Sequence, residues 1–273
     1  ANCFEFDRQI DFSCNGLKYC RNNGSCFQNH PVCPSTVICS CPECYHGPQC
    51  QLNTHTFLLS LDVILGYHIH PQISFSQQPL PIQISVTLLI LLTIVGLISS
   101  ILSIITFRSK TLQKVGCGIY LYICSIDCLL LVLLLNVKFW FLVLFQMNLI
   151  SNPTVLLLNC ILIELLLKTF FSLIDWLNVC VSIERVISII KGVQFNKIRS
   201  RTSAKYVIIT LSLFIPLSYL HDPVHRQLLS DDEENRIWCF VSYDPIWFSY
   251  NSVINIIHVA IPFLINIVSA FLI

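Results

Sequence analysis

The chain has 273 residues, of which 55% are hydrophobic and 11% are charged, and its formal net charge is +1. Soluble domains carry about 25% charged residues, so this composition is typical of a membrane protein. The near-neutral charge, without a basic stripe interleaved with aromatic residues, gives no indication of a nucleic-acid partner.

Cysteines divide the chain into two parts, because nine of the 15 lie in the first 50 residues. Such density is typical of small oxidised extracellular modules. We therefore predict four regions: an N-terminal segment at 1–13, a disulfide-rich module at 14–51, a linker at 52–82 and a membrane domain at 83–273. Residue 1 is Ala and no signal peptide precedes the module, so we expect a mature form or a fragment.

The module has a specific cysteine spacing, C-x5-C-x5-C-x12-C-x-C-x2-C-x5-C between Cys14 and Cys50, with C-R-N-N-G-S-C at 20–26 and C-S-C-P-E-C-Y-H-G-P-Q-C at 39–50. This pattern closely resembles an EGF-like domain, a small β module. Spacing alone leaves the pairing of six cysteines open. The resemblance implies the bridges Cys14–Cys26, Cys20–Cys39 and Cys41–Cys50.

Two cysteines, Cys33 and Cys44, are additional to the EGF-like pattern, and we expect them to pair with each other. Gly24 and Gly47 lie where tight turns favour a positive φ. Asn23 begins an Asn-Gly-Ser sequon, which predicts glycosylation on an exposed turn. Zinc is an alternative use of the thiols, but a disulfide framework is favoured beside a membrane domain, so we expect no metal or cofactor. The zinc alternative would use Cys39, Cys41, Cys44 and Cys50.

Five apolar stretches are long enough to cross a bilayer as helices. The fold class is therefore a mainly α membrane protein preceded by a small β module. The predicted helices lie at about 84–107, 116–145, 155–190, 204–220 and 246–273.

The connections between these spans predict the orientation. Basic residues without acids follow the first span, and six more basic residues surround the connection from the third span to the fourth. The connection from the fourth span to the fifth has six acids and two arginines. Since basic loops favour the cytoplasmic side, the N-terminus lies outside, where a disulfide module belongs.

The third span organises the rest of the chain. The 25 helical steps from Cys160 to Arg185 cover roughly 37 Å, enough to cross a bilayer on a tilt. Glu164, Lys168 and Asp175 make lipid exposure costly, so this helix is expected at the bundle centre. Cys160 at its outer end is placed to bond with Cys239 in the outer loop.

These marks together resemble the rhodopsin-like (class A) G-protein-coupled receptors over residues 82–273. The resemblance rests on the cysteine pair, on Glu184-Arg185-Val186 at the inner end of the third span, on Asp127 in the second span and on Pro262 in the fifth. It implies a seven-helix bundle, of which five helices are present, with a heterotrimeric G protein as partner. Arg185 would then hold a contact to Glu184 in the inactive state and engage the G protein when released. Asp127 would hold a sodium ion in the resting bundle.

Each implied role has a structural alternative. Asp127 would otherwise be a hydrogen-bonded core acid without an ion, and Arg185 would otherwise reach the headgroups as part of an interfacial pair. Val186 replaces the family's tyrosine, and Ser99-Ser100 replaces its first-helix asparagine. The family's sixth and seventh helices are absent, so we expect that this chain does not signal alone.

Glu164 and Lys168 are spaced i,i+4 and form either a charged wall of a ligand cavity or a self-satisfied pair. The first interpretation suits a peptide ligand, and the sequence D-W-L-N-V-C-V-S-I-E-R looks like that of FMRFamide-type peptide receptors. We thus expect a plasma-membrane peptide receptor. The alternative is a membrane-anchored adhesion protein that binds partners through its EGF-like module. No internal repeat favours a transporter, and no paired acids or hydrolase motif favours an enzyme.

Overall fold

The structure is a computed structural model, and it describes residues 20–28, 37–43, 45–46, 50, 52–53, 65–66, 69, 77–147, 149, 152–231, 236–241 and 243–273. The chain divides into two compact units, residues 1–59 and residues 60–273, which are described separately. A helical part with five candidate membrane spans and a small disulfide-linked strand pair confirm the predicted fold class.

The N-terminal unit contains two short antiparallel pairs. Strand β1 (Ser25–Gln28) pairs with β2 (Val37–Ser40), and β3 (Tyr45–His46) pairs with β4 (Leu52–Asn53). Disulfides join Cys20 to Cys39 and Cys41 to Cys50, as the resemblance to EGF-like domains implies. Cys26 is also disulfide-bonded. So small a unit has little core, and bridges of this kind stabilise it by roughly 2–4 kcal/mol each.

Other predicted features of this unit fall partly outside the described residues. Cys14, Cys33 and Cys44 lie outside the described residues, so the bridges Cys14–Cys26 and Cys33–Cys44 stay predictions. Gly47 also lies outside them, so its predicted turn stays a prediction. The positive φ predicted for Gly24 is wrong. The turn instead places its left-handed backbone at Asn22 and Asn23, with φ of 51° and 61°. Asparagine tolerates this conformation better than most residues.

Gly24 is needed for space rather than for backbone conformation. A Cβ on it would lie 2.6 Å from the Sγ of Cys50. The side chain of Asn22 donates a hydrogen bond of 2.9 Å to the Cys50 carbonyl. The turn thus packs directly against the last bridge of the unit.

The second unit contains the five membrane spans. They are α2 (Leu80–Phe107), α3 (Gly116–Gln146), a continuous helix of α4 (Pro153–Leu158), η3 (Asn159–Ile163) and α5 (Glu164–Lys191), then α6 (Lys197–Ser218) with the short α7 (His221–Val224), and finally α8 (Pro245–Asn255), η5 (Ile256–Ala260) and α9 (Ile261–Leu272). Short 3-10 turns, η2 (Leu112–Lys114) and η4 (Gly192–Gln194), lie at the α2–α3 and α5–α6 connections.

The fourth span begins earlier than predicted, at Lys197 rather than near residue 204. Asn196 caps it, because its side-chain oxygen accepts hydrogen bonds of 3.1 Å from the backbone N–H groups of Ile198 and Arg199. Apolar content identifies only the part of a helix inside the bilayer, whereas this cap lies in the polar first turns. Pro216 does not end α6, which continues to Ser218.

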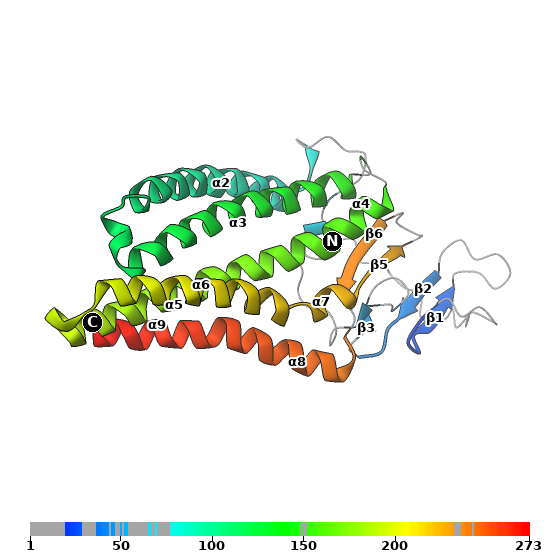
Figure 1. Cartoon of the computed structure of the whole chain (residues 1–273). Coiled ribbons are helices and arrows are strands. Elements are labelled where there is room, and N and C mark those ends of the chain that lie inside the picture. Colours follow the sequence, from blue (N-terminus) through cyan, green and yellow to red (C-terminus); the bar gives the residue numbers. More distant parts are fainter. Residues whose placement is uncertain are drawn as a thin grey trace. The chain divides into compact units, whose positions relative to one another are not determined.

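Helix α5 occupies the centre of the bundle, as predicted. It packs against α3, α6 and α9, and Figure 1 shows it running between α3 and α9. The main core cluster includes Tyr120 of α3, Leu173 and Leu177 of α5, and Ala204 and Ile215 of α6. Helix α2 packs on α3 and leaves most of its apolar surface exposed, as expected for a lipid-facing helix.

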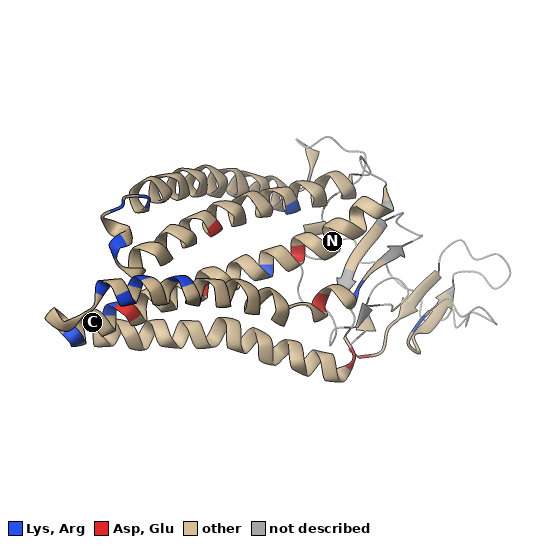
Figure 2. Cartoon of the chain, in the orientation of Figure 1, with Lys and Arg blue, Asp and Glu red and all other residues tan. Residues whose placement is uncertain are grey.

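An antiparallel hairpin closes one end of this unit. Strand β5 (Arg226–Asp231) pairs with β6 (Arg236–Val241), and Leu228 lies opposite Cys239. At the opposite end of the helices, Figure 2 shows Lys and Arg residues gathered around the α2–α3 and α5–α6 connections. The two ends of the bundle therefore differ in both structure and charge.

Candidate functional site

A disulfide joins the central helix to the hairpin. Cys160 lies in the π-helical turn η3 and is fully buried, and its sulfur bonds to Cys239 of β6 across a sequence separation of 79 residues. The two Cα atoms are 5.8 Å apart. The sequence predicts this pair. It ties the hairpin to the end of the bundle.

Five charged side chains form a cluster beside this disulfide. Lys138 of α3 forms an ion pair of 2.9 Å with Glu164, and Lys168 forms one of 2.6 Å with Asp222 of α7. Arg226 of β5 links the two pairs, because its guanidinium lies 2.6 Å from Asp222 and 3.7 Å from Glu164. The cluster has three cations and two acids, so it carries one positive charge in excess.

The sequence places Glu164 and Lys168 together, but it does not identify their partners. Each forms its ion pair with a residue of another element rather than with its i,i+4 neighbour. A lysine within a membrane span either pairs with another group or reaches the interface, and Lys138 pairs with an acid. The sequence does not identify Asp222 and Arg226 as members of this cluster, because they lie in the connection between the fourth and fifth spans, and the sequence does not specify where that connection packs on the bundle.

Tyr243 completes the cluster on the hairpin side. Its hydroxyl donates a hydrogen bond to Asp222, whose side chain is 0% exposed. Burial, followed by this hydrogen bond, raises the pKa of the Tyr243 hydroxyl above its ordinary value. Tyr243 therefore stays a neutral donor. A guanidinium N–H of Arg226 also lies 3.7 Å from the sulfur of Cys239, so the cluster and the disulfide form one assembly.

A second polar network crosses the middle of the bundle at His258. The indole N–H of Trp176 donates 3.0 Å to Nδ1 of His258, so that nitrogen is the acceptor. The proton therefore resides on Nε2, which lies 2.9 Å from the hydroxyl of Ser218. That hydroxyl donates to the Ile215 carbonyl, which α6 leaves open because the Tyr219 N–H turns to Pro216. These bonds fix His258 as one neutral tautomer.

At the other end of α5, Glu184 accepts a hydrogen bond of 2.7 Å from the hydroxyl of Ser200. The backbone N–H of Gly116 donates to the same hydroxyl at 3.0 Å. A Cβ on Gly116 would lie 2.5 Å from Glu184 Oε2 and 2.9 Å from the Ser200 carbonyl. The absence of a side chain on Gly116 thus allows α3, α5 and α6 to meet here.

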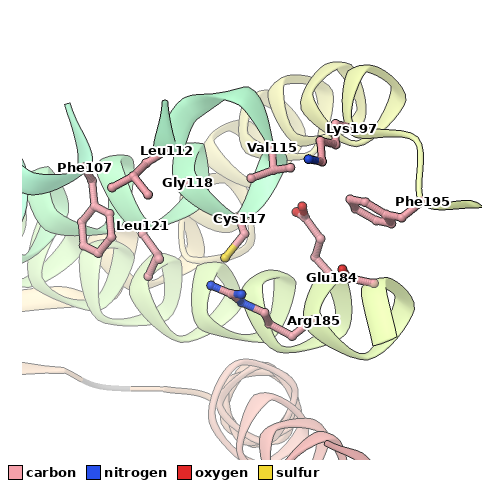
Figure 3. Close-up of a pocket in the computed structure, with 11 residues that line it drawn as sticks. Phe107, Leu112, Val115, Cys117, Gly118, Leu121, Glu184, Arg185, Phe195 and Lys197 are labelled. Carbon is pink, nitrogen blue, oxygen red and sulfur yellow. The ribbon is translucent and has the colours of Figure 1, made fainter. Parts of the chain in front are cut away.

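In the structure, the side chains of Glu184 and Arg185 point to different partners and do not form the expected contact with each other (Figure 3). Of the ion pairs in the described bundle residues, none joins these two side chains. Figure 3 shows the Arg185 guanidinium pointing toward the sulfur of Cys117, whereas Glu184 points toward Lys197 and Phe195. Both residues line a pocket of about 200 Å³ between the ends of α2, α3, α5 and α6. Arg185 is exposed and accessible from this end.

Asp127 lies buried in α3, as the sequence predicts. Its Oδ2 has no hydrogen-bond partner among the described residues. A buried carboxylate oxygen without a donor is costly, and it suits a cation or a further donor. No group of three metal-ligating side chains occurs in the part of the chain that the structure describes.

Asn23 of the N-terminal unit is exposed, as a glycosylation site requires.

The fold and these sites define a multi-pass membrane protein with an N-terminal disulfide-bonded β region. No family model matches the chain, and no curated protein matches it.

Proposed function

We propose that this chain belongs to a cell-surface receptor of the rhodopsin-like G-protein-coupled class with an EGF-like module outside the membrane. One observation carries the proposal. The central helix α5 is bonded through Cys160 to the outer hairpin and presents Arg185 at its other end, beside a pocket. A ligand that displaces the hairpin has a direct mechanical connection to the surface that would meet a G protein.

The orientation in the plasma membrane is supported by the charge distribution. Basic residues gather at the bundle end that carries Arg185 (Figure 2), and cytoplasmic loops are enriched in Lys and Arg. The disulfide hairpin and the N-terminal unit then lie outside, where disulfides persist.

The charged cluster beside the Cys160–Cys239 disulfide has one positive charge in excess, which supports a peptide ligand with an acidic group. In this proposal Asp127 holds a sodium ion or a hydrogen-bond donor inside the bundle.

The test uses the complete gene product that contains this chain, expressed on cells, and measures energy transfer between it and a Gα subunit. Arg185→Ala should reduce recruitment at least about tenfold, since one buried hydrogen bond to a charged group is worth roughly 1.5–3 kcal/mol. Arg201→Ala, in the same basic tract, is the matched control. Recruitment that is unchanged by Arg185→Ala at equal surface expression would contradict the proposal.

A second candidate is an adhesion protein whose N-terminal module binds partners. It is favoured by the division of the chain into two compact units, the first with its own disulfides. Cells expressing the full chain would then adhere to neighbouring cells or matrix, and deletion of residues 1–59 would abolish adhesion. If the same deletion in the complete gene product leaves G-protein recruitment normal, signalling would be assigned to the membrane domain.

A further inference from the structure

A hollow of about 490 Å³ lies between the last turns of α5 and the first turns of α6. Its lining has two kinds of surface. One side is apolar and lies within the spans, and the other is polar and lies around the α5–α6 connection. The apolar side includes Ile183, Ile187 and Val207, and the polar side includes Lys191, Arg199 and Ser203.

The apolar side is open rather than packed. Ile183 is 40% exposed and Ile187 is 39% exposed, one turn apart on α5. Both belong to a helix of membrane-spanning length and composition. Side chains in this position contact hydrocarbon chains rather than water. This surface therefore fits an acyl chain.

The polar side carries an excess of positive charge. Lys191 and Arg199 are exposed cations, and Glu184 is the acid among the lining residues. Glu184 already accepts a hydrogen bond from Ser200, whereas no described ion pair occupies either cation. The first free N–H groups of α6 are satisfied by Asn196, so any anion here would be bound by side chains.

We propose that this hollow binds one anionic phospholipid, with its phosphate at Lys191 and Arg199 and an acyl chain along Ile183 and Ile187. Ammonium and guanidinium groups both bind phosphate oxygens through charge-assisted hydrogen bonds. The apolar wall adds a surface that a free phosphate does not use. This inference requires only the membrane-spanning bundle and does not depend on receptor activity.

The test is native mass spectrometry of the full chain in detergent, titrated with dioleoyl phosphatidylinositol 4-phosphate. Dioleoyl phosphatidylcholine is the neutral lipid, and soluble inositol 1,4-bisphosphate supplies the headgroup without acyl chains. The anionic lipid should bind at least about tenfold more tightly than the neutral lipid, since Lys191 and Arg199 attract its phosphate groups. It should also bind at least about tenfold more tightly than the soluble headgroup, since its acyl chain buries apolar surface along Ile183 and Ile187.

Two matched pairs of substitutions locate the site. Lys191→Gln with Arg199→Gln should weaken binding of the anionic lipid by about tenfold. Arg201→Gln with Lys205→Gln removes the same charge from exposed residues of the same tract that do not line the hollow, and it should change binding less than about twofold. Ile187→Ser should weaken binding of the anionic lipid and leave binding of the soluble headgroup unchanged.

Three results would overturn the proposal. Equal loss with both charge pairs would mean diffuse attraction to a basic surface. Equal binding of the soluble headgroup would mean that no acyl chain is held. Equal binding of the neutral lipid would mean that the cations do not select the headgroup, and this comparison needs no variant.

Discussion

Lys138 of α3 and Glu164 of α5 form an ion pair of 2.9 Å in which the lysine side chain is only 2% exposed. Both charges lie inside candidate membrane spans, and the Glu164 side chain is 19% exposed. The pair therefore joins α3 to the central helix near its disulfide-bonded end, and removing one partner leaves the other charge buried.

The first prediction concerns this pair. Lys138→Met should destabilise the bundle by about 3 kcal/mol, because Glu164 loses its ion pair of 2.9 Å and keeps Arg226 at the longer distance of 3.7 Å. Adding Glu164→Gln should recover part of the loss. The free energy of unfolding in mixed detergent measures both, with exposed Lys110→Met as the control. An equal loss in the control would contradict the prediction.

The second prediction concerns Asp222, which joins Lys168, Arg226 and Tyr243. Asp222→Asn should cost about 3–5 kcal/mol, since it leaves two cations without their carboxylate. Asp244→Asn, at an exposed position on the same connection, should change stability by less than about 0.5 kcal/mol. Thermal unfolding of the two variants side by side makes the comparison.

The third prediction concerns the disulfide between Cys160 and Cys239. Cys239→Ser should lower stability by about 4 kcal/mol, because the bridge closes a long loop. Cys160→Ser should have the same effect, and the double variant should be no worse than either single one. Additive losses in this cycle would show that the two sulfurs act separately. Peptide mass spectrometry without reduction checks the bond directly.

The fourth prediction is a pH dependence at Tyr243. Its pKa in the folded chain is raised above the value of about 10 found in unfolded chains, so its contribution is complete below pH 10 and is lost as the pH rises further. Tyr243→Phe should cost roughly 1.5–3 kcal/mol at pH 8, the range for a hydrogen bond to a charged group. The difference between wild type and variant should shrink above pH 10. A constant difference would contradict this account.

The fifth prediction concerns the junction at Gly116. Gly116→Ala should destabilise the junction of α3, α5 and α6 by about 1–3 kcal/mol, because the new methyl group would collide with Glu184 and with the Ser200 carbonyl. Glu184→Ala in the same chain should restore only part of the stability, since the backbone contact stays. Gly192→Ala tests an open position, where the cost comes from the positive φ of 48° alone.

The sequence predicts the spans and the Cys160–Cys239 bridge because both follow from composition and spacing. It does not predict that Glu164 meets Lys138 or that Lys168 meets Asp222. Those contacts depend on how each helix is rotated about its axis, and apolar residues on every face of a membrane helix leave that rotation unspecified. The start of α6 at Lys197 could have been predicted, since Asn196 precedes it and asparagine is a preferred N-cap residue.

Helix α2 has 28 residues, only 6% of its most apolar stretch is buried, and it packs chiefly on α3. At about 1.5 Å per residue it exceeds the roughly 30 Å hydrocarbon thickness, so it must tilt or extend into the headgroups. With so little protein to hold its angle, the thickness of the surrounding bilayer sets it. Short-chain lipids would lean this helix further and long-chain lipids would straighten it, while the disulfide-anchored α5 keeps its angle.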